Sequence, residues 1–214
     1  MKYKIERNTV QETLILPLYS RKLCSELYPN LYRDETAVRL IDQIDYDFSV
    51  AEKNSRSLMQ RFGVLEVAMR QCDLAWEVRD YLKTHPCAAV FFASGVFYYF
   101  LTQQVKALVQ EMADAFPGGV LVFDAANRTA VKMIAKTWLR TAKIKDVGAY
   151  FAVSDAKSEL SPWDSRLQVS SRGYMMGYND LKDPSVSGFF RFLAKVGDNG
   201  MKMQIVKIGF GDRQ

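Results

Sequence analysis

One stretch, residues 88–126, constrains the fold more than any other because strand and helix patterns alternate within it. Ala88–Ala93 is apolar on both alternations, which is typical of a strand buried on both faces. Leu101–Phe116 has apolar residues at helical spacing, with Thr102 as its expected cap. Val120–Phe123 is a second apolar strand. Strand, helix and strand with short joints predict a βαβ unit whose strands are parallel and adjacent.

The same unit predicts where a ligand lies. In an open α/β sheet, ligands bind beyond the carboxyl ends of the parallel strands. Those ends are Ser94-Gly95 after the first strand and Asp124 after the second. Asp124 is either a residue of the ligand pocket or, as we favour, the cap of the following helix.

Residues 1–85 carry helical patterns and no strand pattern, so we expect an N-terminal helical lobe or lid ahead of the sheet. The spacing predicts helices at Gln11–Leu27, Asp34–Ile44 and Ser57–Lys83. Asp34 is the expected cap of the second helix, and Gly63 is a candidate break in the third. Residues 86–214 are expected to form the core of the same combined domain.

The remainder of the chain continues the mixture of helix and strand patterns. The predicted elements are helices at Thr129–Ala142 and Ser185–Val196, strands at Leu167–Ser171 and Met201–Phe210, and turns at Pro162-Trp163 and Asp198–Gly200. The chain is therefore expected to be an α/β protein.

Composition excludes several classes of protein. Apolar residues make up 49% of the 214 residues and charged residues 25%, the usual globular balance. The net charge of +5 is spread along the chain, which favours a solvated basic surface over nucleic-acid binding. No apolar run approaches the ~20 residues of a membrane span, and the first residues do not resemble a signal peptide. Cys24, Cys72 and Cys87 share no close spacing, which indicates reduced thiols and a cytoplasmic protein.

A single histidine, His85, limits the chemistry further. It excludes sites that need two histidines and argues against a Ser-His-Asp triad, because Pro86 follows it at a joint between helix and strand. We expect His85 to interact with the last carbonyls of a helix. No spacing of Cys, His or acidic residues predicts a metal site.

Several motifs together resemble a known family. They are Glu12–Tyr19, Arg33–Val38, Ile44–Phe48, Ala68–Gln71, Val78–Leu82, His85-Pro86, Phe92–Phe100, Phe116–Gly119 and Phe123–Ala125. In order and character they resemble the leucine carboxyl methyltransferase family, closest to its branch of tetracenomycin-type polyketide O-methyltransferases. The resemblance implies a class I methyltransferase (Rossmann-like) sheet with helices on both faces. It also implies S-adenosylmethionine as cofactor and a small-molecule hydroxyl or a carboxylate as methyl acceptor.

The chain departs from this family between Val90 and Phe91. At this point the family has its first sheet strands and a glycine-rich turn, whose backbone approaches the cofactor. An acidic residue at the end of the next strand accepts hydrogen bonds from the ribose hydroxyls of the cofactor. A βαβ unit needs roughly 30 residues or more, and no stretch of this chain has room for the missing one. Three explanations account for the missing region. The gene carries a natural internal deletion, the protein is truncated internally, or the sequence joins two segments across omitted residues. The pattern Gly209–Asp212 near the end of the sequence has no helix after it and is expected to be a tail.

The resemblance assigns the cofactor site to Arg70, Ser94 and Gly95. Arg70 matches the family arginine that pairs with the methionine carboxylate of the cofactor, and a guanidinium fork fits a carboxylate. A surface helix arginine is the alternative. Ser94 and Gly95 are small residues that let a cofactor or substrate pass close to the backbone.

Tyr19, Tyr98 and Tyr99 are the candidates for contact with substrate, with core packing as the alternative for the last two. Tyr19 and Arg21 are also candidates for a lid over the site. No residue is a convincing general base, which favours a carboxylate acceptor or an inactive protein. The rival hypothesis is a non-catalytic binding or scaffold protein built on a methyltransferase fold.

Overall fold

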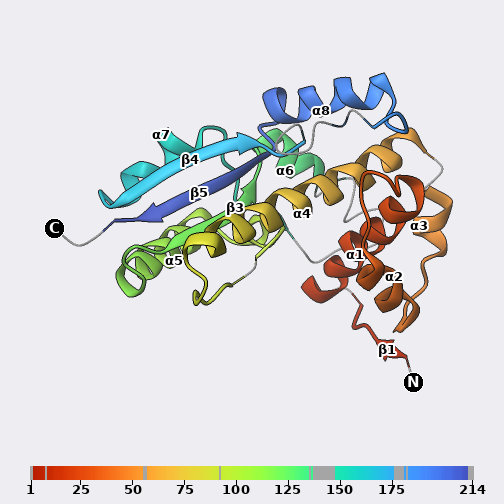
Figure 1. The fold of residues 1–214 in the computed structure, drawn as a ribbon, viewed down its shortest axis with the longest axis horizontal. Helices are drawn as coiled ribbons and strands as arrows, with labels where there is room; N and C mark the ends of the chain where they lie inside the picture. Colours follow the sequence, from red (N-terminus) through yellow and green to blue (C-terminus); the bar gives the residue numbers. More distant parts are fainter. Residues whose placement is uncertain are drawn as a thin grey trace.

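A three-stranded sheet lies at one end of the molecule, on the left in Figure 1, and the N-terminal helices lie at the other end. The computed structural model describes residues 2–7, 9–54, 57–91, 93–134, 136, 148–175, 181 and 183–211. The strands are β3 (Val120–Ala125), β4 (Leu167–Gly173) and β5 (Gln204–Phe210), in the order β3-β5-β4. The last strand, β5, is central and runs antiparallel to both neighbours, so that Val206 lies opposite Phe123 on one side and Ser171 on the other. The described chain is therefore a mixed α and β structure.

The predicted parallel partner of β3 is wrong. Residues 88–91 and 93–96 form no strand, and Phe92 lies outside the described residues. The run still follows the direction of β3. The ring of Phe91 lies 6.5 Å from that of Phe116, just before β3 begins, and the Gly95 N–H reaches Asp124 near the end of β3. A strand buried on both faces needs elements covering both. Here the Phe91 side chain is 80% exposed, so nothing among the described residues supplies that cover.

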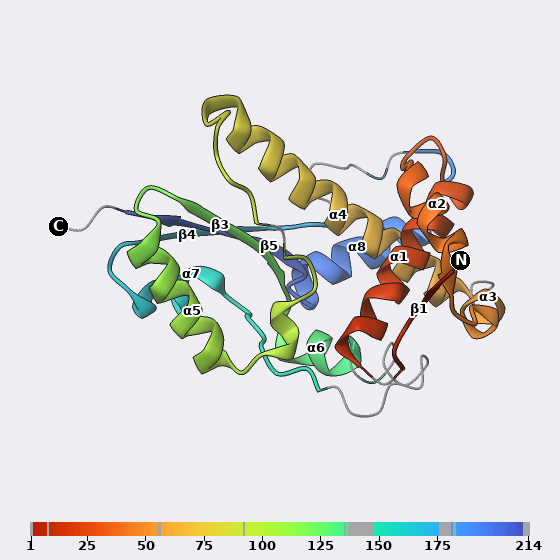
Figure 2. The same cartoon turned by 90° about the horizontal axis from the view of Figure 1, so that it is seen from below.

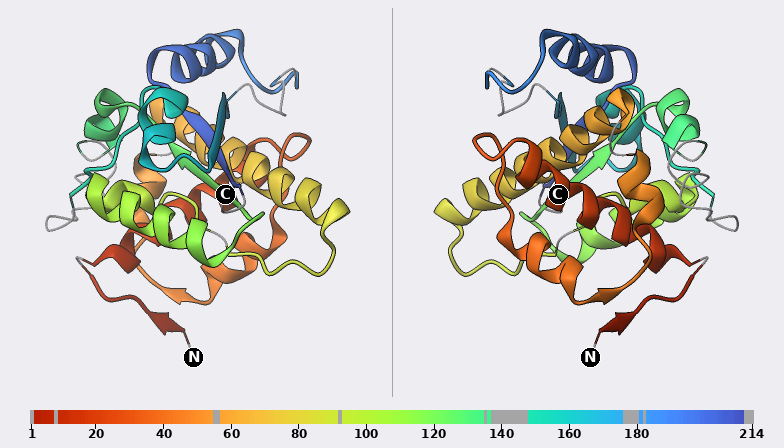
Figure 3. Two further views of the ribbon diagram at one scale, coloured as in Figure 1. Left: turned by 90° about the vertical axis from the view of Figure 1, so that its left-hand side faces the viewer. Right: turned by 90° about the vertical axis from the view of Figure 1, so that its right-hand side faces the viewer.

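Helices cover both faces of the sheet, as expected. Leu121 and Phe123 of β3 point into an apolar cluster with α5 (Thr102–Ala115) and α7 (Ala156–Leu160). Val122, on the opposite alternation, packs against a cluster with α4 (Leu58–Thr84) and α8 (Gly188–Gly200). Figure 3 shows α8 and α5 on opposite sides of the strands. Asp124 shares the alternation of Val122 and so faces α4.

The long helix α4 links the N-terminal helices to the sheet (Figure 2). It runs for 27 residues without a break at Gly63, so the predicted interruption is wrong. Ser57 caps its start, where the side chain accepts a hydrogen bond from the Gln60 N–H at 3.2 Å. At its end the His85 N–H donates to the Tyr81 carbonyl at 3.1 Å, which confirms the predicted place of His85 at a helix C-terminus.

The N-terminal helices agree with their sequence patterns. They are α1 (Val10–Leu27), α2 (Glu35–Asp42) and α3 (Ser49–Asn54). Asp34 caps α2 as predicted, since its Oδ1 accepts from the Ala37 N–H at 2.8 Å. Arg21 of α1 also binds Asp34, through Nε at 2.8 Å. The expectation of no strand before residue 85 is wrong in one detail, because β1 (Tyr3–Lys4) and β2 (Ile44–Asp45) pair in parallel.

The other helices differ from expectation at their ends. α5 begins at Thr102, but its N-cap is Leu101, whose N–H donates to Gln104 Oε1 at 2.8 Å. The predicted turns at Pro162-Trp163 and Asp198–Gly200 belong to a 3₁₀ helix and to α8, respectively. The described part of the helix predicted at Thr129–Ala142 is α6 (Arg128–Ile134), and residues 137–147 lie outside the described range. In the described chain, no helix combines the length and the apolar character that crossing a membrane requires.

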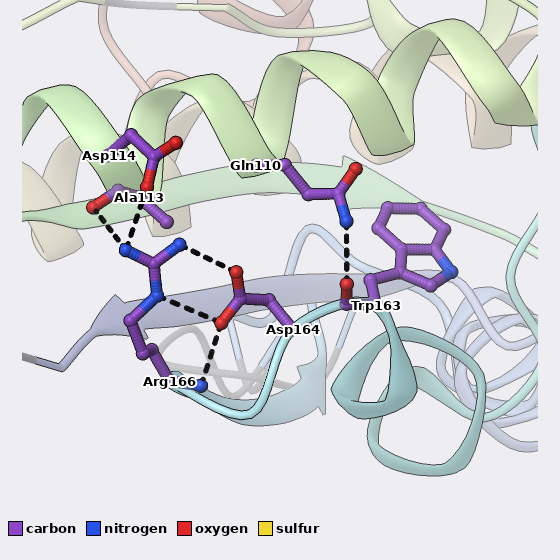
Figure 4. Close-up of polar contacts among 6 residues, drawn as sticks. All are labelled: Gln110, Ala113, Asp114, Trp163, Asp164 and Arg166. Carbon is purple, nitrogen blue, oxygen red and sulfur yellow. Dashed lines mark hydrogen bonds and ion pairs between the residues drawn. The ribbon is translucent and has the colours of Figure 1, made fainter. Parts of the chain in front are cut away.

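Arg166 ties α5 to the segment before β4 (Figure 4). Its Nε and Nη2 donate to the two oxygens of Asp164 at 2.9 and 2.6 Å, and its Nη1 reaches Asp114 at 2.8 Å. Nearby, Gln110 Nε2 donates to the Trp163 carbonyl at 2.7 Å. A bidentate guanidinium–carboxylate pair of this kind fixes geometry better than a single contact does.

We predict that this pair makes stability depend on pH below about pH 4. Hydrogen bonds from Arg166 lower the pKa of Asp164 to about 2. A lowered pKa contributes stability above the ordinary value of about 4, and this contribution is lost as pH falls toward 2. Urea unfolding of the wild type and of Asp164→Asn, measured from pH 5 to pH 2, should show the gap between them narrowing. Glu111→Gln, at an exposed position of α5, is the control and should show no narrowing. A gap for Asp164→Asn that stays constant would contradict the prediction.

Candidate functional site

A stripe of charged residues on α4 faces the sheet. Its members are Glu66, Arg70, Asp73 and Glu77, spaced by four, three and four residues. This is the spacing with which an apolar helix face usually meets a core. Asp73 and Glu77 are buried, and the Arg70 side chain is only 11% exposed. Charged groups at such positions need partners, because an unpaired buried charge is strongly unfavourable.

The central partner is Asp124 of β3. Its Oδ2 accepts from Arg70 Nη1 at 3.2 Å, and its Oδ1 accepts from the backbone N–H of Gly95 at 2.6 Å. The Asp124 side chain is 1% exposed. The predicted role of Asp124 as a helix cap is therefore wrong, and Asn127 caps α6 instead, through the Ala130 N–H at 3.0 Å.

The backbone conformation at this place requires a glycine, Gly95. Its φ of +69° is a left-handed conformation that residues with a Cβ rarely adopt. A Cβ at this position would lie 3.5 Å from both terminal nitrogens of the Arg70 guanidinium. The backbone N–H of Gly95 and the guanidinium thus converge on one carboxylate.

Two tyrosines and Glu66 surround the pair. The Tyr174 hydroxyl donates to Glu66 Oε1 at 3.3 Å. Burial, with the nearby charge of Glu66, raises the pKa of Tyr174, and burial with the charge of Asp124 raises the pKa of Tyr98. Burial also raises the pKa of Glu66, against the opposing effect of Arg70. For Arg70, burial lowers the pKa, but Asp124, the two tyrosines and Glu66 together outweigh burial and raise it above its ordinary value. Both tyrosines are therefore neutral and Arg70 is charged.

The cluster contains buried polar atoms that are not satisfied by hydrogen bonds. Among the described residues, Arg70 Nε has no hydrogen-bond partner. The Tyr98 hydroxyl makes no bond of normal geometry, but it lies close enough to Asp124 for that carboxylate to raise its pKa. Tyr98 is 4% exposed, so solvent does not reach its hydroxyl freely. Such atoms are uncommon in protein interiors, and in this chain the Tyr28 hydroxyl and the Nε atoms of Arg61 and Arg172 are further examples.

Further along α4 the stripe meets the other two strands. Arg172 of β4 donates to Asp73 Oδ2 at 2.7 Å, and Lys207 of β5 donates to Glu77 Oε2 at 3.1 Å. Arg172 also reaches Glu77, at 3.4 Å. These pairs hold the second half of α4 on the sheet, and their charges are matched within the group.

The structure brings together some of the predicted site residues and not others. Arg70, Gly95 and Tyr98 form one group around Asp124. Ser94 precedes Gly95 and is half-buried, and Tyr99 follows Tyr98 and is half-buried as well. Placement alone assigns neither of these two a role.

Tyr19 and Arg21 lie among the N-terminal helices instead. Tyr19 is buried and stacks on Phe48, with ring centroids 4.8 Å apart. Burial, with the charge of Glu52, raises the pKa of Tyr19 to about 12. Arg21 is held by Asp34. Their contacts hold α1 to the connectors that precede α2 and α3.

Sequence reasoning missed Glu66, Tyr174 and the ion pairs of Asp73 and Glu77. One signal was present: four charged residues at the spacing of a single helix face. Such a stripe is usually solvated, and only the position of α4 on the sheet shows otherwise.

Comparisons with known proteins identify no relative. No family model, no curated protein and no solved structure matches the chain. The resemblance to the leucine carboxyl methyltransferases therefore rests on the motifs quoted above. Within the described ranges, no group of three or more His, Cys, Asp or Glu side chains is arranged to hold a metal ion.

We predict that Arg70 and Asp124 are energetically coupled. Arg70→Met leaves two buried carboxylates without their cation and should lower the free energy of unfolding by about 3–5 kcal/mol. In Arg70→Met/Asp124→Asn one of those charges is gone, so the loss should be smaller than the sum of the two single losses by about 1–3 kcal/mol. Urea unfolding of the four proteins measures this cycle. Additive losses would show that the pair contributes no coupling.

Proposed function

We propose that the chain is an S-adenosylmethionine-dependent O-methyltransferase. The observation that carries the proposal is the convergence of Arg70 and Gly95, two residues that the family resemblance assigns to the cofactor. They are far apart in sequence and come from a helix and a loop. Their donors meet at one carboxylate position beside the buried hydroxyl of Tyr98.

These residues fit one end of the cofactor. Arg70 and the Gly95 N–H would bind the carboxylate of its methionine part, and the unsatisfied Nε of Arg70 supplies a further contact. When bound, the cofactor supplies an electrophilic methyl group on sulfur. The chain's contribution is to hold the ligand and orient it.

The sheet supports the finer proposal of a class I methyltransferase fold. In that fold the last strand of the chain inserts antiparallel between two others at one edge of the sheet. β5 has this place between β3 and β4. Helices on both faces agree with the same proposal. The strands that would carry the glycine-rich turn are the part that the sequence lacks between Val90 and Phe91.

We propose a carboxylate or a hydroxyl of a small molecule, such as a polyketide, as the methyl acceptor. A carboxylate acceptor needs no general base. Both tyrosines of the cluster have raised pKa values, so neither of them is suited to remove a proton from an acceptor near neutral pH.

The proposal predicts cofactor binding that depends on the guanidinium fork of Arg70. Isothermal titration with S-adenosylmethionine and with S-adenosylhomocysteine should give one site. Arg70→Lys keeps the charge but not the fork and should weaken binding by about tenfold. Arg21→Lys, which alters an arginine bound to Asp34, is the control and should bind as the wild type does. A folded wild-type chain that binds neither compound would overturn the proposal.

A second candidate is a non-catalytic binding or scaffold protein on a methyltransferase fold. The position of Asp124 favours it, because its carboxylate already uses the donors that would bind the cofactor. The same titration separates the two candidates, since only the first one requires binding of either compound.

A further inference from the structure

Asp124 is bound in the way that a ligand carboxylate would be. One oxygen accepts from a guanidinium at 3.2 Å and the other from a backbone N–H at 2.6 Å. A guanidinium and a backbone N–H that converge on two oxygens of one anion form a common carboxylate-binding arrangement. Here the anion belongs to the protein.

The pair leaves binding capacity unused. Asp124 engages Nη1 of Arg70, while Nε is buried and makes no hydrogen bond to any described residue. A carboxylate that took Nε and a terminal nitrogen together would make two charge-assisted bonds to Arg70, where Asp124 makes one. The Tyr98 hydroxyl is equally buried and lies beside Asp124 in the same group.

We propose that Arg70 and the Gly95 N–H form a carboxylate-binding site that Asp124 occupies from within, so that Asp124 competes with any carboxylate ligand. Where that ligand is S-adenosylmethionine, the competition with Asp124 rests on the proposed function. The chemistry itself is that of a carboxylate, either of a free amino acid or of S-adenosylmethionine. Asp124 keeps the site closed until a ligand displaces it.

Asp124→Asn tests the proposal with little change of shape. The amide oxygen still accepts from the Gly95 N–H, but the NH₂ group then faces Arg70, donor against donor. The guanidinium is therefore released. A ligand's apparent affinity is reduced by the fraction of molecules in the competent state. If Asp124 leaves Arg70 in a tenth of molecules or fewer, its removal tightens binding at least ~10-fold.

The first measurement is rescue of stability. Sodium acetate and L-methionine should raise the unfolding temperature of Asp124→Asn and of Asp124→Ser, and leave that of the wild type unchanged. Sodium chloride at the same ionic strength is the control for general salt effects. If a variant is unfolded in buffer, recovery of its circular dichroism on addition of acetate is the equivalent readout. If Asp124 is only a structural partner, both variants are destabilised and acetate rescues neither, which would overturn the proposal.

The second measurement separates the two sources of carboxylate. S-adenosylhomocysteine should bind Asp124→Asn at least ~10-fold more tightly than the wild type, whereas methylthioadenosine, which lacks the amino-acid end, should show no such gain. Rescue by acetate without any binding of S-adenosylhomocysteine would support the carboxylate site and overturn the methyltransferase proposal. Binding of S-adenosylhomocysteine that weakens in Asp124→Asn, without rescue by acetate, would overturn competition and leave the methyltransferase proposal standing.

Discussion

The ion pairs between α4 and the sheet are the interaction on which the arrangement of this chain depends. Each ion taken out of water costs several kcal/mol, and only pairing and hydrogen bonding offset that penalty. The pairs Arg70–Asp124, Asp73–Arg172 and Glu77–Lys207 lie along one helix face and involve all three strands. A shift of α4 by one turn, about 5.4 Å, would separate every pair at once. These pairs therefore help to fix the position of α4. The helix α1 packs on α4, and α2 packs on α1.

The secondary structure was largely predictable because its signals are local. Asp34 caps α2 from the adjacent residues, and β3, β4 and β5 each show their own apolar or alternating pattern. Strand pairing was not predictable in the same way. The run from Ala88 to Ala93 has the composition of a buried strand, but burial depends on what covers it. The partner that β3 finds is instead the last strand of the chain.

The candidate site was predictable only in part, because some of its contacts leave a signal in the sequence and others do not. Arg70 and Gly95 were identified through family motifs, which carry three-dimensional information within a linear pattern. The role of Asp124 depends on a helix residue 54 positions earlier, and nothing in its immediate neighbours indicates that contact. Glu66 is a comparable case, because a glutamate at helical spacing usually faces solvent until a sheet is placed against it.

The charges that stabilise the fold at this site are the same charges that would bind a ligand, and this limits how tightly a ligand can bind. A carboxylate that replaces Asp124 exchanges one anion for another on Arg70, so its net gain is small. Displaced from its donors, Asp124 is a buried carboxylate without its partners, and this opposes binding. A ligand therefore needs further contacts to displace it. In the family that the motifs resemble, a glycine-rich turn supplies such contacts to the adenosine end, and this chain lacks that turn between Val90 and Phe91. Under the proposed function, the absent turn and the internal carboxylate act in the same direction, because each of them would weaken cofactor binding.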